Sequence, residues 1–456
     1  MAVDLSSLRP LLSPGARIDE NVTTTLPLRL SEYKAPQPGG IVHPATEKDV
    51  QTTVQWAIAY SVPFLVQNGG NGWATTFKLN HQGILIQLDQ MRAIAFNVAG
   101  TEVTVSGGAL VSDVVTAASA RGSLVTTGTC NCVGQLGAIL GGGFNNLVGQ
   151  YGLGIDNLLA LNVVTPDGLA ITIKKPKTAS APSDLWWAMR GAGPNFGVVT
   201  SAVMKAYPVG NVARLSAWTG PLVFRPDQLE AVISALRNLS LTPLMAVAVT
   251  IINAPQPSIF ATLFYHGSAD AGRAAFKVLF DIKPVSDFTA VTPYTDWNAG
   301  SDTACIKGGR RPTWAVGLAS LDPLTWRKTY TVWAELSQQP GAERSSILLN
   351  VLPLDKVRSV PDAASAYPFR NTVKFFASLT ASYSDPAFDA TAVSYGQKAR
   401  AIWQATDGLA QHSTYINNAF GDENLKTIYG DSLPRLRLLK QKIDPHRRFN
   451  EWFPLS

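Results

Sequence analysis

A glycine-rich stretch from Gly128 to Asn157 holds the residues with the clearest chemical meaning in this sequence. Nine glycines lie between Gly128 and Gly154, and Asp156 is the only charged residue of the stretch. Glycine is placed where backbone must approach another group closely or adopt a positive φ. Such a run offers bare backbone N–H groups, which suit the diphosphate and ring edge of a large cofactor. The alternative is a loop with several tight turns.

Two common phosphate-binding motifs are excluded by their spacing. The run Gly141-Gly142-Gly143-Phe144 lacks the third glycine of the dinucleotide fingerprint. No GxxxxGK[ST] phosphate loop occurs anywhere in the chain. The glycine-rich stretch therefore needs a different interpretation, which depends on the elements around it.

Local patterns predict the elements that lead into and out of the glycines. After a helix-poor lead-in over residues 1–36, Thr46 is the expected N-cap of a helix, with Asp49 as its capping-box partner. Residues 62–66 form a buried apolar run, typical of a strand, which ends at a second glycine cluster, QNGGNGW at residues 67–73. Residues 158–164 predict another strand, closed by the turn residues of Thr165-Pro166-Asp167-Gly168.

The middle of the chain, from about residue 206 to 411, has a different pattern. Apolar alternation predicts strands at 245–253, 259–266, 315–321, 347–351 and 373–383. Helical spacing predicts amphipathic helices near 227–239, 271–282, 325–338 and 387–406. Strands pooled with helices favour one antiparallel sheet covered on one face.

Composition limits the class of protein. The 456 residues are 46% hydrophobic and 15% charged, with 37 glycines and 29 prolines, which predicts a globular chain of two or three domains rich in turns. The net charge of +6 is spread along the chain, which favours a solvated surface over nucleic-acid binding. Three cysteines are too few for a disulfide framework, and five scattered histidines have no metal-ligand spacing.

The chain carries neither the apolar core of a signal peptide nor an apolar run that reaches a membrane span. We therefore expect a soluble protein without membrane contact, cytoplasmic, or located in the secretory lumen if a leader was removed.

Several strings together resemble one family. Gly-Thr-Cys130-x-x-Val133-Gly134, Leu140-Gly141-Gly142-Gly143, Tyr151-Gly152-Leu153 and Asp156-Asn157 resemble the second FAD-binding segment of the berberine bridge enzyme-like flavin oxidases. These belong to the vanillyl-alcohol oxidase and p-cresol methylhydroxylase (PCMH) superfamily. The cluster at 67–73 resembles the first pyrophosphate loop of that family. DLWWAMRGAGPNFGVVT at 184–200 looks like its DLWWALRGGGxNFGIVT segment, where the last strand of the flavin domain lies along the cofactor.

The resemblance extends in order over about residues 38–450, ending in a YxN strand at 415–417 and a closing helix. It implies an α+β protein of two domains. Residues 1–205, with the returning segment 412–456, would form a PCMH-type FAD-binding domain, and residues 206–411 an antiparallel-sheet substrate domain covered by helices. The implied FAD-binding residues are Gln67, Asn68, Gly69, Gly70, Asn71, Gly72, Trp73, Gly128, Thr129, Cys130, Val133, Gly134, Gly137, Gly141, Gly142, Tyr151, Gly152, Ile155, Asp156, Gly197, Val198, Val199, Asn417 and Asn418.

The sequence departs from the family where the flavin is commonly attached. Asn71 stands where relatives carry a histidine bonded to the flavin 8α-methyl carbon, and an amide nitrogen cannot form that bond. Cys130 aligns with the cysteine that relatives attach to C6 of the ring, while Cys132 is two residues away. Cys130 is thus either the residue that attaches to C6 of the flavin or a small buried thiol that lines the cofactor site. Phe369 replaces the histidine of the PHR string of relatives.

Tyr415 stands where relatives use a tyrosine as the base for a substrate O–H, so it is the candidate catalytic residue. Its alternative role is to pack on the flavin ring. Trp73, Trp186, Trp187 and Trp403 are expected to be packing residues because they bury so much area.

The resemblance implies an FAD-linked oxidase that acts on a small-molecule substrate and returns electrons to molecular oxygen, similar to fungal enzymes that act on secondary metabolites. A redox-silent FAD-containing cyclase or pericyclase is the alternative, because of Asn71 and Phe369. A non-enzymatic flavin-binding role has nothing specific in its favour. Neither the substrate nor the oligomeric state is predicted.

Overall fold

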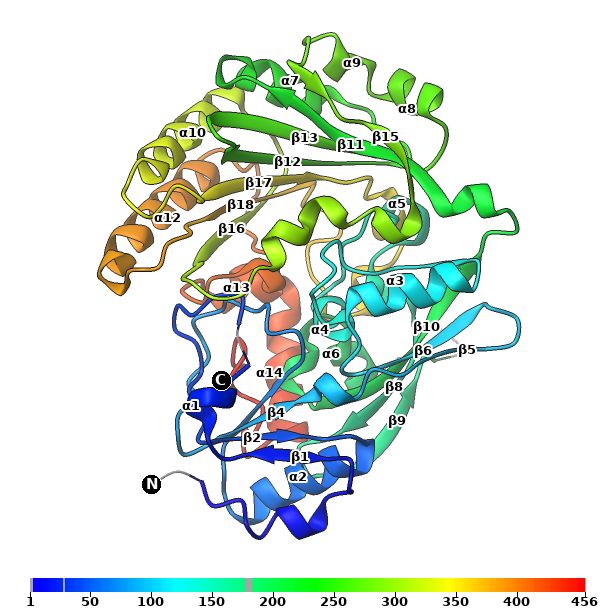
Figure 1. The fold of residues 1–456 in the computed structure, drawn as a ribbon, viewed down its shortest axis with the longest axis vertical. Helices are drawn as coiled ribbons and strands as arrows, with labels where there is room; N and C mark the ends of the chain where they lie inside the picture. The colour runs from blue at the N-terminus through cyan, green and yellow to red at the C-terminus, as the bar shows by residue number, and fades with distance from the viewer. Residues whose placement is uncertain (1–2, 28, 177–182, 456) are drawn as a thin grey trace.

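The computed structural model describes residues 3–27, 29–176 and 183–455, and within them the chain forms three sheets (Figure 1). The smallest has the order β1 (Arg17–Asp19), β2 (Gly40–His43), β4 (Ile84–Gln87), β3 (Phe64–Gln67). Strands β2, β4 and β3 are parallel, and α2 (Glu47–Ala59) connects β2 to β3. The predicted capping box of Thr46 and Asp49 is confirmed at the start of α2. Strand β3 ends at Gln67, where the first glycine loop (residues 67–73) begins.

The second sheet carries the glycine-rich stretch between its strands. It is antiparallel, with the order β5 (Ile94–Phe96), β6 (Glu102–Ser106), β10 (Val198–Pro208), β8 (Leu158–Val164), β9 (Ala170–Lys174), and β7 (Ser123–Val125) also pairs with β10. Its helices are α3 (Val111–Ala120), α4 (Gln135–Leu140), α5 (Val148–Tyr151) and α6 (Asp184–Ala192). The predicted strand 158–164 is confirmed. Trp186 and Trp187 of α6 are buried in the core, as expected for packing residues.

The third sheet is the predicted antiparallel one. Its path is β14 (Ser286–Asp287), β11 (Ser216–Phe224), β13 (Pro257–Tyr265), β12 (Met245–Asn253), β17 (Ser346–Val351), β18 (Phe375–Thr380), β16 (Thr313–Leu318), with β15 (Ala290–Pro293) paired to β11. The helices α7 (Leu229–Asn238), α10 (Pro323–Ser337) and α12 (Asp389–Gln404) lie on its outer face (Figure 1). Trp403 is buried between them and the sheet. The α+β class with a helix-covered antiparallel sheet is confirmed.

Two predicted elements are wrong in detail. The helix predicted at 271–282 is two short helices, α8 (Ala269–Ala275) and α9 (Lys277–Phe280). The YxN segment is not a strand, because the N–H of Asn418 donates to the carbonyl of Tyr415 at 2.8 Å and closes a 3-10 helix, Ile416–Asn418. The remaining helices are α1 (Val22–Thr25), α11 (Asp355–Arg358), α13 (Leu425–Tyr429) and α14 (Leu433–Ile443).

The closing helix α14 returns to the first part of the chain. Leu436 and Leu439 belong to the same core as the helices and strands of the second sheet. The buried Lys440 donates to the backbone carbonyls of Asn195 (2.8 Å) and Phe449 (2.5 Å) and pairs with Asp444 at 2.7 Å. No helix in the described ranges is long and apolar enough to cross a membrane.

Candidate functional site

The first glycine loop turns its carbonyls into the protein. The carbonyl of Gly69 accepts from Lys307 Nζ at 2.6 Å, that of Gly70 from the N–H of Leu30 at 2.9 Å, and that of Gly72 from Arg29 Nη2 at 2.6 Å. A trans peptide points its N–H opposite to its C=O. The next N–H groups, of Gly70, Asn71 and Trp73, therefore point away from these partners, and no described residue accepts a hydrogen bond from them. This is a row of oriented donors for an anion.

The second glycine loop, residues 128–134, follows the same rule. Its carbonyls at Asn131 and Val133 accept from the N–H groups of Ser112 and Val111, whereas the N–H groups of Thr129, Asn131, Cys132 and Gly134 have no acceptor in the described part of the chain. The two loops touch, because a Cβ on Gly69 would lie 2.7 Å from the Cys132 carbonyl and 2.8 Å from the Gly134 nitrogen. Both loops therefore present free donors in one region.

Side chains fasten the two loops to each other and to the rest of the site. Asn68 Nδ2 donates to the carbonyl of Ala109 at 3.0 Å, and Gln67 Nε2 to Gln87 Oε1 at 3.0 Å. Asn71 Nδ2 donates to the Cys132 carbonyl at 2.9 Å. Trp73 Nε1 reaches the carbonyl of Asn418 at 3.4 Å, which connects the first loop to the C-terminal segment.

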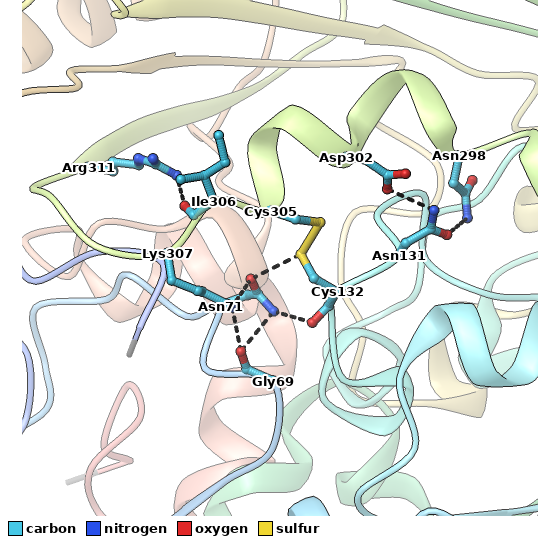
Figure 2. The surroundings of a disulfide bond; sticks show 10 residues. All are labelled: Gly69, Asn71, Asn131, Cys132, Asn298, Asp302, Cys305, Ile306, Lys307 and Arg311. Atoms are coloured by element: carbon cyan, nitrogen blue, oxygen red, sulfur yellow. Dashed lines mark hydrogen bonds between the residues drawn. A yellow bond between two sulfur atoms is a disulfide. The ribbon is translucent and has the colours of Figure 1, made fainter. Parts of the chain in front are cut away.

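A disulfide joins Cys132 to Cys305, a pair that the sequence analysis did not predict (Figure 2). The two cysteines are 173 positions apart, so no local spacing could have indicated the pair. The bond fastens residues 305–311 beside both loops, and Lys307 Nζ then lies 2.7 Å from Asn71 Oδ1. Cys130 keeps a free thiol. Burial raises the pKa of this thiol, and a hydrogen bond with Ser301 opposes the rise only in part.

Three cationic side chains, Arg29, Lys307 and Arg311, lie around the first loop. The sequence analysis identified none of them as a site residue. Arg29 is 7% exposed, bonds to Gln67 and lies 5.0 Å from the ring of Phe77. Burial, together with the charges of Arg29 and Arg311, lowers the pKa of Lys307 to about 8. Among the described residues, no carboxylate forms an ion pair with any of the three. The loop region therefore carries uncompensated positive charge.

Further along, the glycines permit close protein contacts. A Cβ on Gly141 would collide with Asn417 Oδ1, and one on Gly142, at φ 149°, would lie 2.9 Å from the Tyr415 ring and 3.0 Å from the Tyr367 ring. Gly137 is exposed, with open space where its Cβ would be. The 141–143 run thus seats the C-terminal segment directly against the glycine-rich stretch.

Tyr415 is held by two hydrogen bonds to its phenol oxygen. The N–H of Gly143 donates at 3.0 Å and Asn417 Nδ2 at 2.8 Å. Asn417 Nδ2 also donates to the carbonyl of Ala138 at 2.7 Å, which fixes its orientation. Both donors favour a phenolate, but burial is the larger effect and raises the pKa of Tyr415 well above its ordinary value. At rest this tyrosine is a neutral phenol whose own proton is not directed at either donor.

Aromatic rings from three parts of the chain surround Tyr415. Its ring centroid lies 4.4 Å from that of Phe144, 6.2 Å from Phe376 and 6.3 Å from Tyr367. Phe144 belongs to the glycine-rich stretch, whereas Tyr367 and Phe376 come from the part of the chain that forms the third sheet. Phe144, Phe376 and Tyr415 are partly buried residues that pack against the core at this junction.

The residues from Tyr151 to Asp156 contact a different set of partners. Asp156 pairs with Arg370 at 2.7 and 2.9 Å, and the Arg370 side chain is fully buried. Tyr151 stacks on Tyr207, with centroids 3.7 Å apart. Ile155 is fully buried, and Gly152 has φ 80°. This group joins the glycine-rich stretch to the segment before β18.

Phe369, which stands in the place of the relatives' histidine, does not face the aromatic cluster. A Cβ on Gly430 would lie 3.1 Å from its ring, and Phe369 itself adopts φ 64°. Tyr367, two residues earlier, takes the position against Gly142 and Tyr415. Gly197, Val198 and Val199 are buried at the start of β10, and Gly197 at φ 153° packs against Val164.

A small pocket lies between the second glycine loop and the segment that follows β15. Gly128 and Thr129 line one side, and Tyr294, Trp297 and Asn298 the other. The free N–H groups of the two loops and the cations beside the first loop fit a large anionic cofactor of the FAD type.

Comparisons with known proteins agree with this geometry. A profile of the FAD binding domain matches residues 38–174. A FAD-linked oxidoreductase of Pyricularia oryzae is 35% identical, over 94% of this chain and 85% of that protein. Another FAD-linked oxidoreductase, from Aspergillus fumigatus, is 32% identical over 91% of each.

Two solved structures share the fold. The berberine bridge enzyme-like protein 1 of Physcomitrella patens matches with a TM-score of 0.83 at 19% identity, over all of both chains. A carbohydrate oxidase from Microdochium nivale matches with a TM-score of 0.82 at 22% identity, over 98% of both. The chain therefore belongs to the FAD-linked oxidoreductases, and it shares its fold with these two proteins.

Proposed function

We propose that the protein is an FAD-dependent oxidase of a small organic substrate, of the secondary-metabolite type, with molecular oxygen as the electron acceptor. In this proposal residues 1–205 and 412–456 bind FAD, and residues 206–411 form the domain that covers the substrate. When bound, FAD supplies the two-electron acceptor, at N5 of its ring. The relatives' names support the oxidoreductase class.

The observation that carries the proposal is the setting of Tyr415. Oxidation of a carbinol to a carbonyl removes a hydride from carbon and a proton from oxygen, so the site needs a group that takes the proton. Tyr415 has a phenol oxygen held by Gly143 and Asn417, whose N–H groups stabilise the negative charge of a phenolate. Because burial raises its pKa, that phenolate is a strong base once it forms. Two electrons and two protons then reduce oxygen to hydrogen peroxide.

The aromatic rings around Tyr415 favour a substrate with an apolar, flat portion. Phe144 and Phe376 lie 4.2 Å apart between centroids and form one wall, with Tyr367 at its edge. Aromatic faces gain most from stacking on planar or apolar groups. This wall supports an aromatic or conjugated alcohol over a sugar as the substrate.

We propose that FAD is bound without a covalent bond. The amide of Asn71 is not a nucleophile, and burial raises the pKa of Cys130, so its thiol stays protonated. The thiolate is the reactive form of cysteine. We also propose that the protein matures in an oxidising compartment, because the Cys132–Cys305 disulfide would not persist among reducing thiols.

Anaerobic mixing tests the oxidase proposal. An aromatic allylic or benzylic alcohol should bleach the visible flavin band, and admission of oxygen should restore the colour and release hydrogen peroxide. The Tyr415→Phe variant mixed with the same alcohols is the matched control, and its flavin should bleach far more slowly. Turnover of a substrate without bleaching would replace the proposal with the redox-silent cyclase.

A further inference from the structure

We propose that Lys307 and Arg29 are positioning residues for the cofactor's diphosphate: they hold the first glycine loop from behind, so that its N–H groups face the anion. The inference rests on FAD binding and not on the oxidase reaction. It assigns a cofactor role to two residues that lie outside both glycine loops.

The first step is the orientation of the peptide groups. Lys307 bonds to the carbonyl of Gly69 and Arg29 to that of Gly72, both at 2.6 Å. Each bonded peptide directs its N–H, that of Gly70 and that of Trp73, to the opposite side. A cation on the carbonyl polarises the peptide, and chained hydrogen bonds strengthen one another, so these N–H groups become better donors.

The second step is the charge. Arg29, Lys307 and Arg311 lie together without a carboxylate partner in the described ranges. The lowered pKa of Lys307 reflects burial first and the charges of Arg29 and Arg311 second. Unpaired buried charge is costly and is retained where something compensates it. A diphosphate on the N–H side of the loop supplies the missing negative charge.

The third step is how Lys307 reaches the loop. Cys305, which lies two residues before Lys307, forms a disulfide with Cys132 of the second loop (Figure 2). On the other side, the N–H of Gly308 donates to the Arg29 carbonyl at 2.9 Å, and the N–H of Arg311 donates to Ser31 Oγ at 2.9 Å. Residues 305–311 are thus held at both ends, and Lys307 Nζ also donates a hydrogen bond to Asn71 Oδ1.

The test measures FAD affinity and uses no substrate, so its outcome does not depend on the oxidase proposal. Holoprotein is diluted, and free FAD is followed by recovery of its fluorescence. Lys307→Gln and Arg29→Gln should each weaken FAD binding about ten- to a hundredfold, as expected for a lost hydrogen bond from a charged group. Lys307→Arg should retain most of the affinity. Lys328→Gln, an exposed lysine on α10 with the same charge change, is the control.

A second ligand separates this role from a merely structural one. Riboflavin lacks the diphosphate, so after removal of FAD its affinity should be the same in wild type and Lys307→Gln. Added salt should weaken FAD binding less steeply in Lys307→Gln than in wild type. Unchanged FAD affinity in both glutamine variants, or an equal loss of riboflavin and FAD affinity, would overturn the proposal.

Discussion

Removal of the Tyr415 hydroxyl should affect the rate of flavin reduction far more than FAD content. In Tyr415→Phe the ring stays among Phe144, Phe376 and Tyr367, so packing is retained. Loss of a positioned base typically costs about 10²–10⁴-fold in rate. The donors of Gly143 and Asn417 also lose their shared acceptor, and each unsatisfied buried donor costs about 1–3 kcal/mol of folding free energy.

The rate of flavin reduction should also depend on pH, in a direction set by the raised pKa of Tyr415. Because burial raises the pKa of Tyr415, the phenolate is a small fraction of the protein near neutral pH. That fraction grows about tenfold per pH unit below the pKa, so the rate constant for flavin reduction at low substrate should rise with a log slope near +1. In Tyr415→Phe the slope should vanish.

Anaerobic stopped-flow measurement of flavin bleaching from pH 6 to 9, with FAD content determined on the same samples, is the assay (about three pH units span a thousandfold change in phenolate). Asn417→Leu is a useful companion, because it removes one donor and keeps the hydroxyl. Equal rates and equal slopes in wild type and Tyr415→Phe would show that Tyr415 is not the base.

Three further predictions concern the supporting structure. Gly142→Val should deplete FAD and lower the Tm, because a Cβ at φ 149° would press on the rings of Tyr415 and Tyr367; normal flavin content in this variant would contradict it. Arg370→Met should destabilise the fold by about 3–5 kcal/mol in denaturant unfolding by leaving Asp156 unpaired, and Arg370→Met combined with Asp156→Leu should recover part of this. A single variant as stable as wild type would show that the pair contributes little. Acid precipitation should leave all flavin in the supernatant; yellow protein that loses its colour in Cys130→Ala would instead establish a thioether link.

Elements whose causes are local could be predicted from the amino-acid sequence. The capping box of Thr46 and Asp49, the strand 158–164 and the amphipathic pattern behind α7, α10 and α12 depend on residues a few positions apart. Dense glycine after a buried strand also indicated backbone N–H groups free to bind a ligand, and in the first loop the N–H groups of Gly70, Asn71 and Trp73 have no acceptor among the described residues. Local free-energy preferences are visible in one sequence because neighbours along the chain are also neighbours in space.

Contacts between groups far apart in the sequence could not be predicted, because they depend on how the whole chain packs. The Cys132–Cys305 bond spans 173 positions, Asp156–Arg370 spans 214, and the Lys307 contact with Gly69 spans 238. These pairs have no period or motif, since they arise where the third sheet, the two loops and the C-terminal segment pack together. The same packing raises the pKa of Tyr415 and lowers that of Lys307, because burial is a property of the whole fold and not of any segment.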